Sequence, residues 1–283
     1  MRRERATVAE LITIIVTTYD RPDALDAVLR SLSRQADRDF EVVIADDGSG
    51  PETAKLIRDW QGRLGAPLKH VRHEHHDFRA GEIRNRGVLA SAGRYCVFLD
   101  GDCLARPDFV AQHRALAEPG WFVRGNRVLL TERLTAAVLR EHLEPERWGL
   151  ADWIGHHFSG GLNRLAPLLN LPLGPLRKLS SGKWEGVQTC NLATWRADLD
   201  RVDGFDAAFS GWGREDSDLV IRLLNAGIRR KDGRCATGVL HLWHPAADRS
   251  RLAENERRLM HAIETERVRA ERGMSTLSAG DDR

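Results

Sequence analysis

Residues 95–108, YCVFLDGDCLARPD, place two carboxylates directly after a short apolar run. The run YCVFL is β-branched and aromatic, which predicts a buried strand, and Pro107 predicts the start of a helix. Asp100 and Asp102 would then lie at the carboxyl end of that strand, where their charges repel unless a cation or a donor lies between them. Oxygen ligands of this kind suit Mg²⁺ or Mn²⁺, ions that also hold diphosphates. For an isolated D-x-D pair, a solvated turn is the simpler alternative.

The composition indicates an ordinary globular protein. Its 283 residues suffice for one large α/β domain or two small ones, and a net charge of +2 gives no basic surface for nucleic acid. The four cysteines form no C-x-x-C pair, which favours reduced thiols. The early apolar run LITIIV is too short for a signal core or a membrane span, so we expect a cytoplasmic protein.

The first half of the chain alternates between expected strands and expected helices. Strands are predicted at 11–19, 40–45, 67–73 and 95–99, and helices at 21–35, from Pro51 onward and at 79–92. This alternation predicts an α/β fold with a mostly parallel sheet and helices on both faces. Because ligands bind at the carboxyl ends of such strands, segments 17–20, 46–47 and 100–102 should converge on one crevice.

A second polar group precedes a predicted amphipathic helix in the C-terminal half. The segment GWGREDSD, residues 211–218, places Glu215 and Asp216 in the first helical turn, where the helix dipole favours carboxylates. Simple N-terminal capping explains one acid well and three acids poorly. Trp212 between two glycines suggests an exposed platform on which a sugar stacks, next to a carboxylate that could act as a general base.

Histidines form two further groups with different interpretations. His241 and His244 could complete an oxygen and nitrogen shell with the upstream acids, which favours Mn²⁺, although lone histidines are usually structural. The segment HVRHEHHDFR, residues 70–79, matches no closed tetrahedral spacing, so we interpret it as a basic strand end facing a diphosphate. Arg79 and Arg84 extend this basic surface along the next helix.

Residues 141–184 lose the regular alternation and are rich in Leu, Pro and Gly. Their leucines, with Arg164, Arg177 and Lys178, could form a surface that contacts a membrane or a lipid-linked acceptor. Their prolines break any long helix, so a packed irregular lid is an equal alternative. The final segment GMSTLSAGDDR predicts a disordered tail.

The ordered motifs resemble those of the family 2 glycosyltransferases with the GT-A fold. From residue 12 to about 244 the matching stretches are VTTYDRPDAL, VVIADDGS, RNRGVLASAGRYCVFLDGD, CNLATWRADLDRVDGFD, GWGREDSDLVIRLLNAG and HLWH. The last two also resemble the C-terminal half of β-1,4-galactosyltransferases and chondroitin-polymerase-type enzymes. The resemblance implies a Rossmann-like, mostly parallel central sheet flanked by helices, with a smaller acceptor-side C-terminal portion.

The resemblance, together with the basic segment, assigns roles to individual residues. Nucleotide-binding roles fall on Thr17, Tyr19, Asp47, Arg79, Arg84 and Asp100, with the base held by Tyr19 and Asp47. Metal-binding roles fall on Asp102, His244 and His241. Asp216 would be the catalytic base and Glu215 would orient the acceptor, while Trp212 and Gly213 would line the sugar site. One departure is Asp20, where many relatives have Asn.

The function implied is an inverting, metal-dependent transfer from a UDP-sugar to a hydroxyl of a glycan or lipid-linked glycan, with Mn²⁺ or Mg²⁺ as cofactor. Cell-envelope polysaccharide assembly, with peripheral contact at the cytoplasmic face of the membrane, is the expected setting. A nucleotidyltransferase that makes nucleotide sugars and a non-catalytic sugar- or nucleotide-binding module remain as alternatives.

The expected organisation of the chain follows from these assignments. It comprises an N-terminal extension at 1–10, a nucleotide-sugar-binding half at 11–130, a variable leucine-rich segment at 131–185, an acceptor and catalytic half at 186–247, a C-terminal helix at 248–271 and a disordered tail at 272–283.

Overall fold

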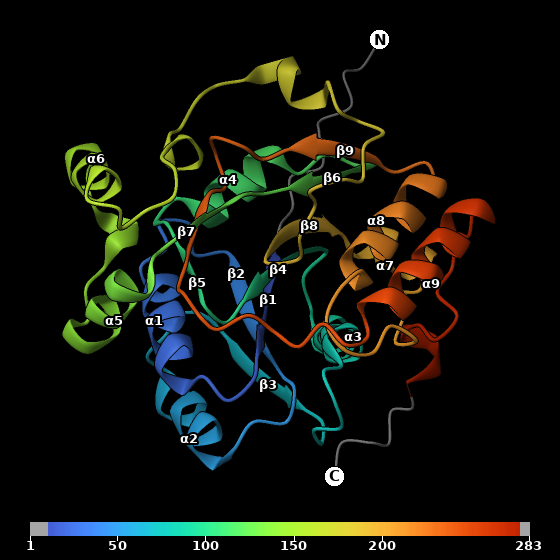
Figure 1. Cartoon of the computed structure of the whole chain (residues 1–283), viewed down its shortest axis with the longest axis horizontal. Coiled ribbons are helices and arrows are strands. Elements are labelled where there is room, and N and C mark those ends of the chain that lie inside the picture. Colours follow the sequence, from blue (N-terminus) through green and yellow to red (C-terminus); the bar gives the residue numbers. More distant parts are fainter. Residues whose placement is uncertain (1–10, 278–283) are drawn as a thin grey trace.

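The computed structural model describes residues 11–277, so the expected extension at 1–10 and the last residues of the expected tail lie outside the described residues. The central sheet has seven strands in the order β3-β2-β1-β4-β8-β6-β9 (Figure 1). Their bounds are β1 Ile12–Thr18, β2 Phe40–Asp46, β3 Leu68–Arg72, β4 Tyr95–Asp100, β6 Trp121–Arg124, β8 Asn191–Trp195 and β9 Arg229–Asp232.

The sheet is mostly parallel, as the alternation predicts. Strands β3, β2, β1 and β4 pair in parallel, whereas β8 runs antiparallel to both of its neighbours. The strand order reverses between β1 and β4, where Thr17 lies opposite Asp100. Open sheets of this type bind ligands at such a reversal point, beyond the carboxyl ends of the strands.

Helices cover both faces of the sheet (Figure 1). Their bounds are α1 Pro22–Ser33, α2 Pro51–Trp60, α3 Ala80–Ala90, α4 Phe109–Leu116, α5 Glu132–Glu141, α6 Leu150–Phe158, α7 Arg196–Val202, α8 Glu215–Asn225 and α9 Leu252–Glu264. Short 3₁₀ turns lie at Pro145–Arg147, Ala166–Leu168, Gly174–Lys178 and Met274–Thr276.

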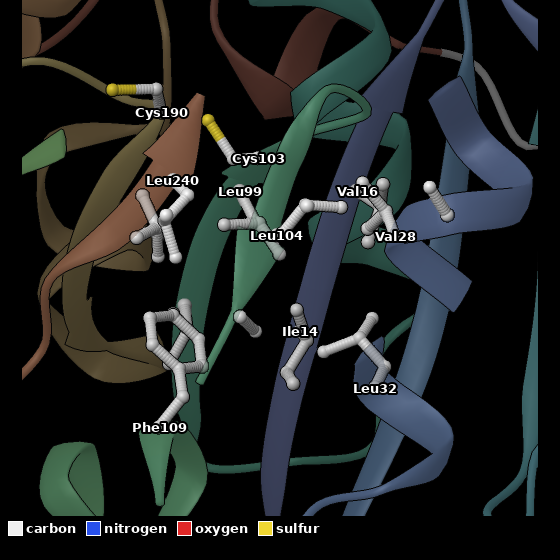
Figure 2. Close-up of a cluster of buried hydrophobic side chains, with 14 of the residues drawn as sticks. Ile14, Val16, Val28, Leu32, Leu99, Cys103, Leu104, Phe109, Cys190 and Leu240 are labelled. Carbon is white, nitrogen blue, oxygen red and sulfur yellow. The ribbon is translucent and has the colours of Figure 1, made fainter. Parts of the chain in front are cut away.

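The hydrophobic core forms two layers because side chains alternate along each strand. Ile14 and Val16 of β1 point toward α1, where they lie against Val28 and Leu32 (Figure 2). Ile15, between them, belongs to the opposite layer with residues from α3, α7 and α8. Both faces of the sheet are therefore buried, which explains the continuous apolar sequence of β1.

A second, three-stranded sheet was not anticipated from the sequence. It joins β5 (Cys103–Ala105), β10 (Val239–His241) and β7 (Arg127–Leu129), with β10 in the middle. Strands of three residues carry too little hydrophobic alternation to be predicted. This sheet matters for function because it sets His241 opposite Cys103, the residue that follows Asp102.

The leucine-rich segment is divided between core and surface. Leu162 and Leu168 are buried, whereas Leu171, Leu176 and Leu179 are exposed. The expected basic surface is partly wrong, because the guanidinium of Arg177 is buried and donates hydrogen bonds to the main-chain oxygens of Asp232, Arg234 and Leu171. Within residues 11–277, no helix combines the length and apolar character needed to cross a bilayer.

The C-terminal end differs from the expected long helix and disordered tail. Helix α9 spans Leu252–Glu264, so it is shorter at both ends than the expected helix at 248–271. The chain is packed through residue 277, because Met274 is buried and Ser275 donates hydrogen bonds from its main-chain N and its Oγ to the carboxylate of Asp203. The polar composition of this segment predicted disorder, because composition alone does not reveal hydrogen bonds to a distant carboxylate.

Candidate active site

One buried arginine joins three segments that are distant in sequence. Arg84 is only 4% exposed, and its Nε donates to Thr17 Oγ1 at 3.2 Å. Its Nη2 donates to Asp100 Oδ1 at 3.3 Å, and its Nη1 donates to Glu215 Oε1 at 3.2 Å. A guanidinium suits this position because its rigid fork can satisfy several acceptors at once. The predicted convergence of the β1 and β4 ends is confirmed, and the start of α8 joins them.

Asp102, His241 and His244 form a cluster with the geometry of a metal site. Their ligand atoms all lie within 4.8 Å of one another. Asp102 Oδ1 lies 3.5 Å from His241 Nε2, and Asp102 Oδ2 lies 3.5 Å from His244 Nε2. Adjacent ligands of an octahedral ion with bonds of about 2.1 Å lie roughly 3 Å apart, so a small inward shift would complete the set.

The protonation chemistry of this cluster also fits a cation. Burial raises the pKa of Asp102, and the nearby Asp100 raises it further, while the two histidines partly offset both effects. Burial lowers the pKa of His241, which keeps its imidazole neutral and able to coordinate. Mixed carboxylate and imidazole donors suit Mn²⁺ better than Ca²⁺.

Helix α8 carries three acids in its first turn, as the sequence indicates, and two of them, Glu215 and Asp216, line the cleft. Arg214, at the N-cap, has a left-handed φ of 77°, so the chain turns sharply before Glu215 and Asp216. Glu215 Oε1 is held by Arg84, whereas Glu215 Oε2 is buried and has no hydrogen-bond partner. Asp216 Oδ1 accepts from the main-chain N of Ser217 at 2.6 Å and from its Oγ at 3.3 Å.

The surroundings of Asp216 raise the pKa of its carboxyl group. Burial raises its pKa, Glu215 raises it further, and Arg84 and Ser217 partly offset them, which leaves a pKa of about 7. A carboxylate with a pKa near the working pH accepts a proton effectively in the transition state.

The metal cluster and Asp216 line two lobes of one cleft. The first, which we call the metal lobe, has a volume of about 570 Å³ and contains Tyr19, Asp102, His241 and His244. The second, the helix lobe, has a volume of about 460 Å³ and contains Glu215, Asp216 and Ser217. The lobes share the walls formed by Phe78, Arg84, Asp100, Arg127, Trp212 and Arg249.

Trp212 and Gly213 lie at the helix lobe, where the sequence predicts a sugar platform. Trp212 is 38% exposed and lines both lobes, and Gly213 lines the helix lobe. The guanidinium of Arg249 lies 4.9 Å from the centre of a Trp212 ring, which fixes one side of the platform. The glycine beside it has a φ of 107°, a conformation that a residue with a Cβ adopts only with strain.

The loop 73–78 covers the corner expected to hold the base. The ring of His75 stacks on Tyr19 with centroids 4.2 Å apart and an interplanar angle of 14°. His75 Nδ1 lies 2.9 Å from the main-chain O of Asp47, and His73 Nε2 lies 2.5 Å from Asp47 Oδ1. Gly48 permits this approach, because a Cβ there would lie 2.5 Å from His75 N.

The interpretation of segment 70–79 as a basic surface for diphosphate is therefore wrong for its histidines. His70 pairs with Asp46 and His73 with Asp47, so these rings meet carboxylates. Arg79 donates to Glu82 Oε2 and to the main-chain O of Glu74, and it does not line either lobe.

Arg127 and Arg249 line both lobes and were not singled out from the sequence. Arg127 belongs to the unpredicted strand β7, and Arg249 lies in the irregular segment before α9. The position of Arg249 a few residues after the HLWH motif is a sequence feature that could have indicated its place in the cleft. No sequence feature indicated the place of Arg127.

Comparison with known families identifies the N-terminal half. Residues 13–142 match the family model described as glycosyl transferase family 2, and residues 180–245 match the model described as N-terminal domain of galactosyltransferase. Residues 13–142 therefore form a glycosyl transferase family 2 region. The first match spans β1 to α5 and includes Asp100 and Asp102; the second includes Asp216 and ends just after His244.

Curated relatives of the chain include glucosyltransferases and a chondroitin synthase. It is 33% identical over 242 residues to the validoxylamine A glucosyltransferase of Streptomyces hygroscopicus subsp. limoneus, which covers 81% of the chain and 51% of that relative. It is 26% identical to the chondroitin synthase of Escherichia coli, over 76% of the chain and 32% of that enzyme. The chain thus spans about half or less of the length of these relatives.

Solved structures confirm the GT-A type of fold. The structure of GalNAc-T7 with UDP, GalNAc and Mn²⁺ has a TM-score of 0.64 and 15% sequence identity to the chain, covering 90% of this chain and 48% of that one. At this identity the likeness concerns the fold alone.

Proposed function

We propose that this protein is an inverting, metal-dependent glycosyltransferase that moves a sugar from a UDP-sugar to a hydroxyl of a glycan or glycolipid. The observation that carries the proposal is the shared cleft, in which the Asp102 cluster and Asp216 line adjoining lobes. A donor bound through its diphosphate in the metal lobe would present its sugar to the helix lobe. The family match and the glycosyltransferase relatives support this reading.

Asp102, His241 and His244 would hold a divalent cation, Mn²⁺ or Mg²⁺. Their donor atoms, spacing and protonation fit such an ion. When bound, the cation would supply positive charge to the diphosphate as it leaves. Asp100, fixed by Arg84, would contact the ribose or a water on the metal.

Transfer itself depends on the first turn of α8. The carboxylate of Asp216 would accept the proton of an acceptor hydroxyl as the new bond to the anomeric carbon forms. The free Oε2 of Glu215 would accept a hydrogen bond from a neighbouring hydroxyl and so orient the acceptor. Attack opposite the leaving group needs one base and inverts the anomeric centre.

The uracil ring would stack on Tyr19 and bond to Asp47, in the corner now covered by His73 and His75. Tyr19 is 41% exposed, so one part of its surface remains open to the metal lobe. A base that uses the covered face must displace His75, because rings 4.2 Å apart admit nothing between them. Thr17 would support this corner through its bond to Arg84.

The acceptor and the cellular setting belong to the same proposal. Cell-envelope polysaccharide assembly, with a glycan or lipid-linked acceptor at the cytoplasmic face of the membrane, agrees with the polysaccharide synthase among the relatives and with the exposed leucines at 171, 176 and 179.

The experiment that tests the proposal measures nucleotide release with Mn²⁺, a panel of UDP- and GDP-sugars and a panel of acceptors. We expect UDP release that requires acceptor, stops with EDTA and returns with Mn²⁺. A nucleotidyltransferase would instead release pyrophosphate from a nucleoside triphosphate and a sugar phosphate. Nucleotide binding without any turnover would favour the non-catalytic module.

A further inference from the structure

Arg127 lies at the junction of the two lobes. It begins β7, opposite Val239 of β10, and lines both the metal lobe and the helix lobe. Its main-chain O accepts hydrogen bonds from Arg164 Nε at 3.2 Å and Nη2 at 2.6 Å. The small sheet and Arg164 thus fix the backbone from which this side chain enters the cleft.

Within residues 11–277, Arg127 differs from the other cleft arginines because its guanidinium contacts neither an acceptor nor an aromatic ring. Arg84 is held by two carboxylates, Arg21 donates to Asp23, and Arg249 lies over Trp212. For Arg127, no hydrogen bond or ion pair of the guanidinium occurs within residues 11–277, although Asp100 and Asp102 act on it electrostatically. The residue is half-buried, so its charge is removed from part of the water that would otherwise solvate it.

We propose that Arg127 binds the β-phosphate of the sugar donor and neutralises the charge that develops there as the sugar leaves. The proposal rests on the proposed function. The sugar–phosphate bond must lie between the cation site at Asp102 and the base at Asp216, and Arg127 lines the cleft on both sides of that point.

The step is balanced without any further reagent. The acceptor oxygen forms a bond to the anomeric carbon, and the bond from that carbon to the β-phosphate oxygen breaks. The electron pair of the broken bond stays on the phosphate oxygen, and the acceptor proton passes to Asp216. A guanidinium beside that phosphate oxygen stabilises the transition state more than the bound donor. Its hydrogen bond to the oxygen strengthens as the negative charge on the oxygen grows.

This assignment also changes the role of Arg84. Its charge is committed to Asp100 and Glu215, which suits a positioning residue that fixes one carboxylate of β4 and one of α8. Arg127 is then the better source of charge for the leaving diphosphate.

The first experiment compares UMP and UDP binding by calorimetry in Mn²⁺ for the wild type, Arg127→Ala and Arg127→Lys. UMP has no β-phosphate, so we expect Arg127→Ala to weaken UDP binding about 10–100-fold and to leave UMP binding within about twofold. Arg127→Lys keeps the charge but loses the forked pair of donors, so its affinity for UDP should lie between those of the wild type and Arg127→Ala. Arg140→Ala, an exposed arginine on α5 paired with Glu141, is the matched control and should bind both nucleotides as the wild type does.

Kinetics give the second readout. Arg127→Ala should lower kcat about 10²–10³-fold, with a partial return when guanidinium ion is added. Equal losses for UMP and UDP, or unchanged UDP binding, would overturn the assignment while leaving the proposed function intact. A loss confined to donors whose sugar carries a carboxylate would also overturn it, because Arg127 would then recognise the sugar. A wild type that binds no nucleoside diphosphate would overturn both proposals.

Discussion

At the scale of single residues, the protonation of Asp216 makes a prediction about pH. Its pKa is about 7 because burial and Glu215 disfavour the charged form. A general base must be deprotonated, so kcat should fall about tenfold per pH unit below 7 and reach a plateau above it. Asp216→Asn should reduce transfer about 10²–10⁴-fold, measured as UDP release.

The raised pKa of Asp216 also predicts how the stability of the folded protein depends on pH. Activity should rise with pH, whereas stability should fall. Because the pKa of Asp216 is higher in the folded protein than its ordinary value of 3.8, the folded state loses stability as the pH rises from about 4 to about 7. Asp216→Asn removes that ionisation, so its Tm should exceed the wild-type Tm by about 2–4 °C at pH 8.5, and by less at pH 5.5. An inactive variant that is also less stable at pH 8.5 would indicate a structural role for this carboxylate.

At the scale of elements, the loop 73–78 is predicted to compete with the nucleotide base. An aromatic stack is worth about 0.5–1.5 kcal/mol, and the base must break the contact of His75 with Tyr19 to use that face. His75→Ala should therefore tighten UDP binding roughly 2–10-fold, whereas Tyr19→Ala should weaken it, as measured by calorimetry. His76→Ala is the control, since His76 is an exposed neighbour in the same loop that pairs with Glu74. Weaker UDP binding by His75→Ala would show that the imidazole helps to hold the base.

The sequence predicts the long strands and helices of this fold, but not its shortest strands or the pairing between strands. The long apolar runs of β1, β2 and β4 predict their strands and the crevice at their carboxyl ends. The acid-rich segment before the apolar pattern of α8 predicts the position of Glu215 and Asp216. The small sheet was missed because its strands have three residues each, and with it the placement of Arg127. The role of His70 and His73 was misread because their partners, Asp46 and Asp47, lie at the end of the neighbouring strand β2. The sequence of one strand does not show which residues of a neighbouring strand lie beside it.

At the scale of the whole molecule, the two halves that match different family models meet at one buried ion network. Arg84 of the N-terminal half bonds to Glu215 of the C-terminal half and to Asp100, and the whole residue is only 4% exposed. Arg84→Met would leave two carboxylates near each other without their cation, and breaking a buried pair in this way costs about 3–5 kcal/mol. For a chain of this size that corresponds to a fall in Tm of roughly 6–20 °C, measured by thermal unfolding. The double variant Arg84→Met with Glu215→Gln should recover part of that loss, because it removes one of the unpaired charges. The guanidinium of Arg84 also lies 5.5 Å from the centre of the Phe205 ring. If the double variant is no more stable than Arg84→Met, Arg84 stabilises the protein through its packing against Phe205. The charge network would then not be what joins the two halves.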